Sequence, residues 1–386
     1  MTLRFLTAGE SHGPQLTVII EGVPAGLPLS ASRDIDGDLR RRQGGYGRGK
    51  RQQIETDRVE ILSGVRGGLT LGSPITLVLP NRDWDNWKGP MQIESVGFKR
   101  KKVTRVRPGH ADLAGVLKYG FDDARNVLER ASARETAARV AAGAVARKLL
   151  GASAGTALSS HVVRIGAVAI PFAGPADPRA VEASEVRCPD PEASARMIQA
   201  IDAAREAGDT LGGTAVVVAS HVVAGLGSYV HWDRKLDGLL AQALCSIPSV
   251  KGVELGAAVE AAASPGSAVH DSPVYSAAGG FRHHSNRQGG LSGGVTDGED
   301  VWALVHFKPI STLLKPLDSV DMHTGEPVRA HYERSDICVV PAGAVIAEAM
   351  AAWVLAAATM EKFGGDSLVE LRRNLAAYRR GLRRLA

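Results

Sequence analysis

Four segments rich in β-branched residues have the pattern of β-strands, and their order along the chain limits the folds available to it. They cover residues 15–20, 71–79, 213–223 and 301–307, and Pro74 interrupts the second of them. Helical patterns are clearest over residues 133–150, 234–246, 343–363 and 367–385. Because strands and helices do not alternate regularly, a doubly wound parallel sheet is not indicated. The sequence predicts an α+β fold in which helices are grouped around sheets.

Length and composition indicate a globular protein without a membrane span. The chain has 386 residues, of which 44 % are hydrophobic and 23 % are charged. Its nearest approach to a membrane span, residues 349–360, is short and lies between Glu348 and Glu361. The first residues lack the apolar run of a secretory signal, and three distant cysteines fit neither a disulfide framework nor a CxxC site. We expect a cytoplasmic protein with free thiols and a single domain over residues 1–386.

The net charge of +5 comes from one end of the chain. Beyond the last acidic residue, Glu370, six arginines follow at positions 372, 373, 379, 380, 383 and 384, and without them acidic and basic residues nearly balance. Two further basic clusters, at 40–51 and 99–107, adjoin turns that contain glycine or proline. Either cluster alone is compatible with a solvated surface loop. Together they favour a small, multiply charged anion over a nucleic acid or a membrane.

Two helix starts can be read from the sequence. Ser132 followed by Glu135 predicts a capping box, and the helix beginning there presents free amides and a positive dipole beside Arg130 and Arg134. This start is either an anion site or an ordinary capped helix. A second helix begins at Ser367 and continues as a basic amphipathic helix over about 367–385. Its leucine stripe predicts a core or subunit contact.

Two of the eleven histidines lie in polar turns rather than in apolar segments. His12 lies in the sequence GESHG, and His110 follows Arg107, Pro108 and Gly109. A histidine in such a place can donate or accept a proton at neutral pH.

The loop at 44–50 follows the P-loop pattern until Arg51, which stands where a magnesium-binding Ser or Thr is needed, so a nucleoside triphosphatase is excluded. No metal-ligand spacing or GxSxG elbow is present.

Eight segments, in this order, resemble the chorismate synthase family over about residues 3–364. They are AGESHG (8–13), RRRQGGYGRG (40–49), RPGHADLAGVLKYG (107–120), ERASARETAARVAAG (129–143), KGVELG (251–256), NRQGGLSGG (286–294), KPIST (308–312) and RSDICVVPA (334–342). The resemblance implies a β-α-β sandwich of antiparallel sheets between helices, and a homotetramer. It also implies a 1,4-anti elimination of phosphate from 5-enolpyruvylshikimate-3-phosphate to give chorismate, the last step of the shikimate pathway. This reaction requires reduced FMN, although it involves no net redox change.

The resemblance assigns roles to individual residues. His12 matches the acid that protonates the leaving phosphate, His110 the residue placed against the flavin, and Asp336 a carboxylate that relays the ring proton. Substrate anions would be held by Arg41, Arg48, Arg107 and Arg134, of which the first two also match positions linked to NADPH in some members. Flavin contacts carry over to Arg130, Ala131, Ser132, Pro248, Ser249, Gly293, Lys308, Pro309, Ile310, Ser311, Thr312 and Arg334.

Two departures from the family pattern affect these assignments. Pro248-Ser249 replaces an amide-Ala pair, so only a backbone contact is expected there. The loop at 43–45 is one residue longer than in some members, which displaces Arg48 relative to Arg41. The motifs do not distinguish members that reduce flavin with NADPH from those that receive it reduced. Two other functions stay open at this point. One is a basic module that binds RNA or DNA through the C-terminal helix and the 99–107 cluster, and the other is a flavin reductase that uses the same FMN site.

Overall fold

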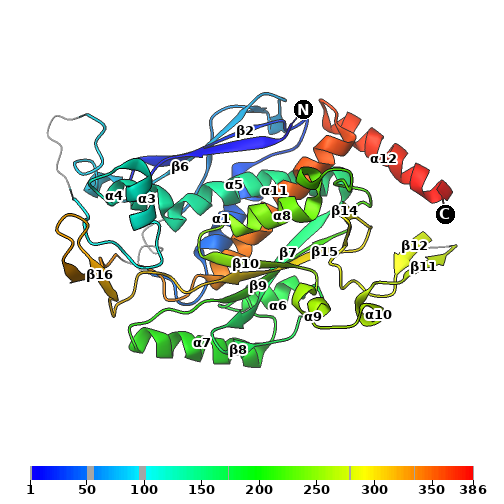
Figure 1. The fold of residues 1–386 in the computed structure, drawn as a ribbon. Coiled ribbons are helices and arrows are strands. Elements are labelled where there is room, and N and C mark those ends of the chain that lie inside the picture. The colour runs from blue at the N-terminus through cyan, green and yellow to red at the C-terminus, as the bar shows by residue number, and fades with distance from the viewer. Residues whose placement is uncertain are drawn as a thin grey trace.

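Long helices lie between two antiparallel sheets, and this layering organises the molecule (Figure 1). The structure is a computed structural model that describes residues 2–49, 56–94, 101–172, 174–277, 280–333 and 335–385. In the middle layer, α5 (Thr136–Ala154) packs along α11 (Val340–Phe363), with α1 (Asp36–Gln43) against both. Helix α5 contacts the smaller sheet and α11 the larger one. The predicted α+β class and the β-α-β sandwich of antiparallel sheets are confirmed, with α5 and α11 lying between the two sheets.

The two sheets are continuous antiparallel arrays. The smaller has the order β1-β2-β6-β3, with β1 Arg4–Ala8, β2 Gln15–Glu21, β6 Ile75–Pro80 and β3 Glu60–Ile61. The larger has the order β10-β15-β9-β7-β8, with β10 Val250–Leu255, β15 Val301–Phe307, β9 Gly213–Ser220, β7 Ala157–Ile165 and β8 Val168–Ala169. In β2, Leu16, Val18 and Ile20 are buried, whereas Ile19 is exposed and pairs with the exposed Leu6 of β1. This alternation is expected for an antiparallel sheet with one solvated face.

Further helices and hairpins surround the sandwich. The helices are α3 (Asp112–Tyr119), α4 (Arg125–Ala131), α6 (Pro178–Ala183), α7 (Pro191–Glu206), α8 (Leu236–Cys245), α9 (Ala258–Ala262), α10 (Gly266–Val269) and α12 (Leu368–Leu385). Short helical turns are η1 (Ala31–Ile35), η2 (Trp84–Asn86), η3 (Ala133–Glu135) and η4 (Trp232–Arg234). The hairpins are β4 (Val65–Arg66) with β5 (Leu69–Thr70), β11 (Pro273–Ser276) with β12 (Gly280–His283), β13 (Leu291–Ser292) with β14 (Val295–Thr296), and β16 (Asp318–Val320) with β17 (Pro327–Arg329).

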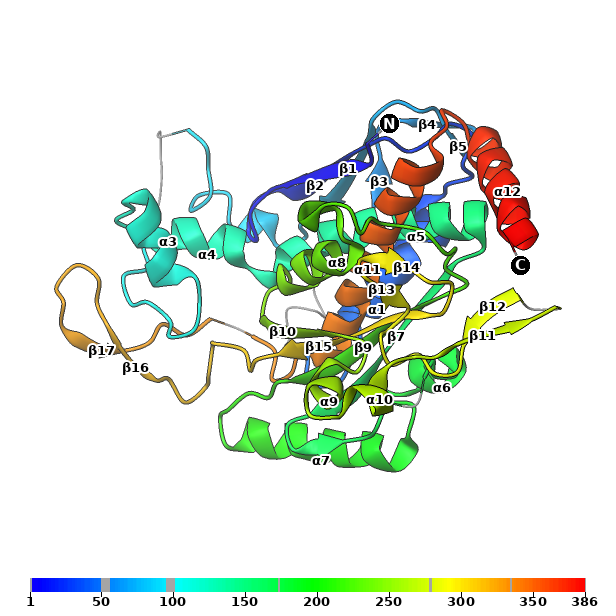
Figure 2. The ribbon, with the colours of Figure 1, turned by 45° about the vertical axis from the view of Figure 1, so that its right-hand side comes forward.

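The two ends of the molecule differ in what they carry. Helices α3 and α4 and the β16–β17 hairpin lie together at one end, and α12 and the β11–β12 hairpin lie at the other (Figure 2). The first end has its own small apolar cluster, formed by Val103, Val106, Val116, Ala124 and Leu128. This cluster matters for function because it joins the segments that carry His110 and Glu129.

The predicted strands and helices occur with small shifts at their ends. β2 and β15 lie where expected, whereas β6 begins at Ile75, because Pro74 has no amide N–H to donate and Gly72 before it has a positive φ. Helix α11 begins three residues earlier than predicted, with Pro341 in its first turn, where a missing amide costs nothing.

The capping box predicted at Ser132 is wrong. The Ser132 hydroxyl accepts from the amide of Arg134, at 3.3 Å, and the first turn is the 3₁₀ turn η3 rather than α-helix. Glu135 does not reach back to Ser132. Its carboxylate instead accepts from Nε of Arg139, at 2.9 Å, and from the hydroxyl of Thr7. The ion pair between Glu135 and Arg139, one helical turn further along, thus replaces the expected hydrogen bond from the Ser132 amide to Glu135.

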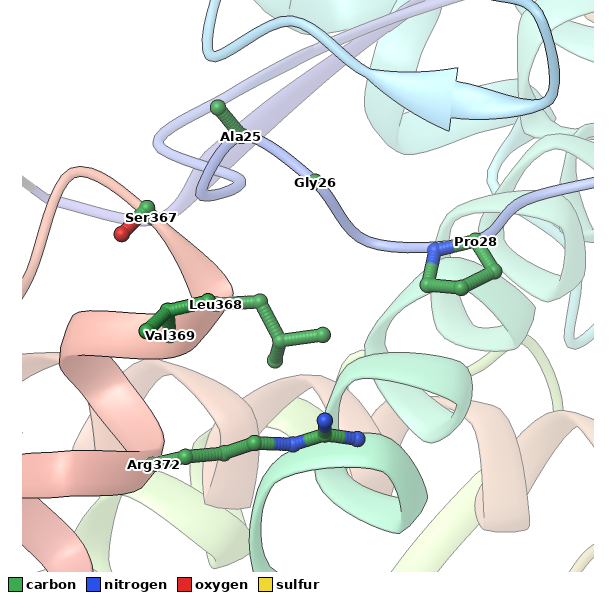
Figure 3. Close-up of a pocket in the computed structure, with 7 residues that line it drawn as sticks. All are labelled: Ala25, Gly26, Pro28, Ser367, Leu368, Val369 and Arg372. Atoms are coloured by element: carbon green, nitrogen blue, oxygen red, sulfur yellow. The ribbon is translucent and has the colours of Figure 1, made fainter.

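The C-terminal helix α12 packs through its leucine stripe, as predicted. Leu368, Leu371 and Leu375 are buried in the main core. The Ser367 hydroxyl accepts from the amide of Glu370 at 3.2 Å, which confirms the predicted helix start. A surface hollow of about 320 Å³ lies between the first turn of α12 and residues 25–28 (Figure 3).

Helix α11 is long and apolar enough to cross a membrane by length and composition alone. Its most apolar 18-residue window is 89 % buried inside the fold, however, as in the core helix of a soluble protein. Close packing explains its glycine: a Cβ at Gly343 would lie 2.6 Å from the ring of Phe307. On the facing helix, a Cβ at Gly143 would lie 2.4 Å from Cβ of Ala349.

Candidate active site

His12 lies in the loop between β1 and β2 and is held by the carboxylate of Glu129 on α4. Nδ1 of His12 lies 2.9 Å from Oε1 of Glu129, and the His12 amide donates to Oε2 at 2.9 Å. The neighbouring Ser11 amide donates to the carbonyl of Glu129, so the loop is docked onto the end of α4. Trp87 stacks on the imidazole with ring centroids 3.8 Å apart. The His12 ring therefore has a fixed orientation.

A chain of charges continues from Glu129. Arg125, one turn earlier on α4, donates to Glu129 at 3.0 Å and to Glu333 at 3.3 Å, and Nε2 of His331 lies 3.0 Å from Glu333. Burial raises the pKa of Glu129, but the hydrogen bonds with His12 and the charge of Arg125 outweigh it and hold the pKa below its usual value. At Glu333 burial is opposed by His331 and Arg125, and the pKa falls to about 2.

His110 has a corresponding carboxylate, Asp112 at the start of α3. Nδ1 of His110 lies 2.5 Å from Oδ1 of Asp112, and Arg107 donates to both oxygens of Asp112, at 2.8 and 3.0 Å. Asp112 is completely buried. Burial alone would raise its pKa, but the hydrogen bonds from His110 and Arg107 hold it well below its usual range. Arg107 is thereby anchored with one guanidinium nitrogen 3.2 Å from the hydroxyl of Thr312.

The Lys308–Thr312 segment follows β15 and lies between the His110 turn and the loop after α8. The Lys308 amide donates to the carbonyl of Ser249, next to Pro248, at 2.8 Å. Nζ of Lys308 donates to the hydroxyl of Ser311 at 2.9 Å, and a Cβ at Gly109 would lie 3.3 Å from that hydroxyl. Pro309 and Ile310 complete the segment, and the Ile310 carbonyl accepts from the hydroxyl of Thr210. These contacts bring two groups of predicted flavin residues together with His110.

The glycine-rich loop after α1 lies against the chain that leads into α11. A Cβ at Gly49 would lie 2.8 Å from the carbonyl oxygen of Ser335, and one at Gly47 would lie 3.3 Å from the Cys338 amide. The anion next to the Gly49 amide is the carboxylate of Asp336, at 2.7 Å, and Nη1 of Arg48 lies 2.7 Å from the other Asp336 oxygen. Among the described residues, Nε of Arg48 is buried without a hydrogen-bond partner.

Arg134 lies beside Arg42 rather than Arg41. Nη1 of Arg134 lies 2.5 Å from Oδ1 of Asp57, and Nη1 of Arg42 lies 3.4 Å from Oδ2 of the same carboxylate. Arg42 is completely buried, and burial lowers its pKa to about 10 despite the charge of Asp57. Arg134 also donates to the amide oxygen of Asn81 at 3.0 Å.

Arg41 points to a different part of the molecule. It donates to both oxygens of Glu348 on α11, at 2.9 and 2.8 Å, and to Asp38 and Glu182. Burial would lower the pKa of Arg41, but the hydrogen bonds and charge of Glu348 raise it above its usual value. Residues 41 and 42 are adjacent on a helix and point about 100° apart, so they serve separate networks.

The remaining flavin candidates are distributed as follows. Arg130 donates to the carbonyls of Thr7 and Gly9, at 3.1 Å each. It is followed by Ala131, the last residue of α4, and by Ser132, which lies between α4 and η3. Arg334 lies outside the described residues, as do Lys50, Arg51, Lys99 and Arg100 of the basic clusters.

Gly293 lies apart from the other candidates, in the β13–β14 turn. Gly294 packs on Lys235 at the start of α8, whereas Ser249 lies beyond its end. Helix α8 has 10 residues and is therefore about 15 Å long. Gly293 lines a hollow of about 360 Å³ with residues of α9, α10 and the 287–291 segment, and no other predicted site residue within the described ranges borders it.

The segment His331–Asp336, without Arg334, connects the three groups of site residues. Glu333 contacts Arg125 of the His12 group, and Asp336 contacts Arg48. The Ser335 hydroxyl donates to the carbonyl of Thr312, whose side chain touches Arg107 of the His110 group. Residues distant in sequence thus converge on one short stretch of backbone.

Four site residues carried no signal strong enough in the sequence to be singled out. They are Glu129, Asp112, Asp57 and Trp87, which orient the predicted histidines and arginines. Glu129 and Asp112 lie inside the quoted motifs, and a search for a carboxylate near each histidine would have found Asp112, two residues from His110. Across the described ranges, no group of three or more His, Cys, Asp or Glu side chains could hold a metal ion.

In chemical terms, the site combines two oriented imidazoles, one oriented carboxylate and several arginines. An imidazole fixed by a carboxylate can transfer a proton, and arginines recognise phosphate and carboxylate groups. The arrangement suits proton transfer on a small polyanion.

Comparisons with known proteins agree with this arrangement. The family model described as chorismate synthase matches residues 3–360. A chorismate synthase of Moorella thermoacetica is 58 % identical over 99 % of this chain and 100 % of its own length. That of Desulforudis audaxviator is 57 % identical over 97 % of each chain. A crystal structure of chorismate synthase superposes with a TM-score of 0.80 at 42 % identity and covers 99 % of both chains.

The family model and the relatives cover nearly the whole chain. They agree with the layered fold and with the way the quoted motifs come together at one site. The chain therefore belongs to the chorismate synthase family, lyases that catalyse the last step of the shikimate pathway.

Proposed function

We propose that the reaction of this chain, the 1,4-anti elimination of phosphate from 5-enolpyruvylshikimate-3-phosphate, requires reduced FMN bound beside the 308–312 segment. The observation that carries this proposal is the His331–Asp336 segment, which connects the His12, His110 and Arg48–Asp336 groups. An elimination needs a proton donor for the leaving group, a proton acceptor for the ring and cations for the phosphate. These three groups supply them.

The residues around the 308–312 segment have the donor chemistry that an anionic cofactor needs. Lys308 and Arg107 provide cations, and burial together with the nearby charge of Lys251 lowers the pKa of Lys308. An anion bound here would relieve that repulsion. Reduced flavin would supply transient electron density to the substrate, and His110, held by Asp112, would hold a proton toward it.

His12 and Asp336 divide the proton transfers between them. His12, oriented by Glu129, would donate the proton that makes phosphate a better leaving group. Asp336 would accept the proton lost from the substrate ring, and its contacts with Arg48 and the Gly49 amide orient its two oxygens. The unpaired Nε of Arg48 and the guanidinium groups of Arg107 and Arg134 would bind the substrate anions.

Arg41 is the predicted anion-binding residue that the geometry supports least, because carboxylates surround its guanidinium. We further propose a cytoplasmic homotetramer in which residues 1–386 form one domain. The flavin would be reduced either by NADPH bound to this chain or by an external reductant, and the assay below distinguishes the two. The single large core, which runs from Leu3 to Leu375, supports the one-domain proposal. A nucleic-acid or membrane partner finds no support in the site.

An anaerobic assay tests the cofactor. The protein is incubated with 5-enolpyruvylshikimate-3-phosphate and either reduced or oxidised FMN, with and without NADPH, and chorismate is measured by its absorbance. Turnover is expected with reduced FMN and not with oxidised FMN alone. If the chain reduces its own flavin, oxidised FMN together with NADPH should also support turnover. Equal turnover with oxidised FMN alone would refute the requirement. NADPH oxidation without any formation of chorismate from the substrate would instead favour a flavin reductase.

The two histidines should fail in different ways. His12→Ala is expected to lower kcat by about 10²–10⁴-fold with flavin binding nearly unchanged. His110→Ala is expected to weaken the binding of reduced FMN as well, measured by anaerobic titration. Near wild-type turnover in both variants would make these histidines structural only.

A further inference from the structure

We propose that Glu129 and Trp87 are positioning residues that determine which nitrogen of His12 exchanges a proton and hold the ring against rotation. The proposal rests on the role proposed for His12 but concerns two residues that are not among the predicted site residues. Both reach His12 from outside its own loop, Glu129 from α4 and Trp87 from the turn after η2.

Glu129 determines the tautomer of the imidazole. Its carboxylate accepts from the His12 amide through Oε2 and lies 2.9 and 3.0 Å from Nδ1 through its two oxygens. A carboxylate can only accept, so Nδ1 must carry its hydrogen. Glu129 stays a carboxylate because His12 and Arg125 together outweigh the effect of burial on its pKa. The proton that His12 gains and loses is consequently the one on Nε2.

Trp87 fixes the plane of the same ring. The two rings are stacked, with 23° between their planes, and the indole N–H donates to Asp83 at 3.1 Å, which holds Trp87 in place. Nζ of Lys101 lies 4.1 Å from the Trp87 ring, and the guanidinium carbon of Arg125 lies 5.1 Å from it. An imidazole that lies against an indole face cannot rotate about its Cβ–Cγ bond without losing the stack and the Glu129 hydrogen bond together.

Among the described charged groups near His12, Glu129 is the one whose side chain contacts the imidazole. Glu129 touches the ring directly. Arg125 contacts Glu129 and the Trp87 ring, and Lys101 contacts the Trp87 ring, so both reach His12 only through those side chains. Glu333 is one step further away, because it contacts Arg125. Neutralising Glu129 removes an anion in contact with the imidazolium. Protonation of His12 should then require a lower pH.

Intrinsic fluorescence tests this without any turnover. A protonated imidazole in contact with an indole quenches its emission, so the wild-type chain should show a pH-dependent step that disappears in both Trp87→Phe and His12→Asn. In Glu129→Gln, which keeps the size and one acceptor, the midpoint should move to lower pH. The matched control is Glu254→Gln, which breaks another Glu–His pair, with His306 on the large sheet, and should leave the step unchanged.

Activity with reduced FMN supplies the second readout. Glu129→Gln and Trp87→Phe should each lower kcat by about 10- to 100-fold, as misplacement of a catalytic group does. KM for the substrate should change little, and the pH dependence of kcat should move with the fluorescence midpoint in Glu129→Gln. Circular dichroism and the melting temperature separate this from misfolding.

The outcomes distinguish the two proposals. A fluorescence step that is unaffected by Glu129→Gln, or a pH profile that does not move with it, overturns the positioning roles. A shifted step in a chain that makes chorismate equally well with oxidised FMN refutes the cofactor proposal and leaves the positioning of His12 intact.

Discussion

Arg48 and Asp336 form an ion pair that joins the glycine-rich loop after α1 to the start of α11, with 2.7 Å between Nη1 and Oδ2. The Gly49 amide donates to the other oxygen of Asp336 across 287 positions of sequence. This carboxylate is therefore held by two donors at a defined orientation, next to a buried guanidinium nitrogen that has no other described partner. A group held in this way can either transfer a proton or serve only to anchor the loop.

Asp336→Asn distinguishes these two roles. If Asp336 accepts the ring proton, the amide should lower kcat by about 10²–10⁴-fold, with KM and flavin affinity little changed. If it is only an anchor, kcat should be retained while the melting temperature falls or binding weakens. Asp202→Asn is the matched control, because Asp202 anchors the same loop by accepting from the hydroxyl of Tyr46 at 2.8 Å. A retained kcat in Asp336→Asn would exclude the proton-transfer role.

The contact between α5 and α11 depends on a missing side chain. Gly143→Ala places a Cβ 2.4 Å from Cβ of Ala349 and should destabilise the protein by about 1–3 kcal/mol, the usual cost of overpacking. Gly151→Ala, on the same helix with its nearest neighbour atom 3.8 Å away, should instead stabilise it by about 0.4–1 kcal/mol. Urea denaturation measures both. Equal effects of the two substitutions would contradict the packing argument.

Helix α12 should contribute to stability and not to chemistry. Leu371→Ala removes a completely buried side chain and should cost about 2–5 kcal/mol. Deletion of residues 366–386 should lower the melting temperature or change sedimentation, because it uncovers the core and also removes the Arg379 donor to the carbonyl of Ala154 at the end of α5. The exposed Arg380→Ala serves as a control. A deletion that abolishes turnover but leaves melting and sedimentation unchanged would assign α12 to the site.

The His12 end of the molecule should be acid-labile. The pKa of Glu333 is about 2 in the folded chain against an ordinary 4.5, so this group contributes stability above pH 4.5 that is lost as the pH falls toward 2. Glu129 and Asp112 are shifted in the same direction. The free energy of unfolding should therefore decrease over this range, and Glu333→Gln should make the decrease shallower. An unchanged pH dependence in that variant would show that the Arg125 pair adds nothing.

The three thiols should differ in reactivity. Burial raises the pKa of Cys338 to about 12 and also raises that of Cys188, whereas Cys245 is exposed at the end of α8. A disulfide reagent should thus label one thiol per native chain, and Cys245→Ser should abolish that labelling. Fast modification of a second thiol would mean that the core opens.

Much of the fold could be predicted because its signals are local. The alternating residues of β2, the continuous apolar run of β15 and the leucine stripe of α12 each report their own burial, so periodicity was enough to locate them. The ends of helices were harder to predict. Ser132 and Glu135 have the capping-box pattern, yet Glu135 pairs with Arg139, because the charged guanidinium one turn away competes with the backbone amide of Ser132 for the Glu135 carboxylate.

The chemistry divides between sequence and tertiary structure in the same way. The sequence by itself determined the residue types of the site, the two histidines in polar turns and the arginine clusters, together with a family resemblance specific enough to name a reaction. Only the tertiary structure decided which carboxylate faces each histidine and that Arg42, not Arg41, lies beside Arg134. It also decided that Gly293 and Ser249 lie at opposite ends of α8. The reason is physical: adjacent residues of a helix point about 100° apart, and a partner such as Glu129, 117 positions from His12, is selected by packing rather than by any local pattern.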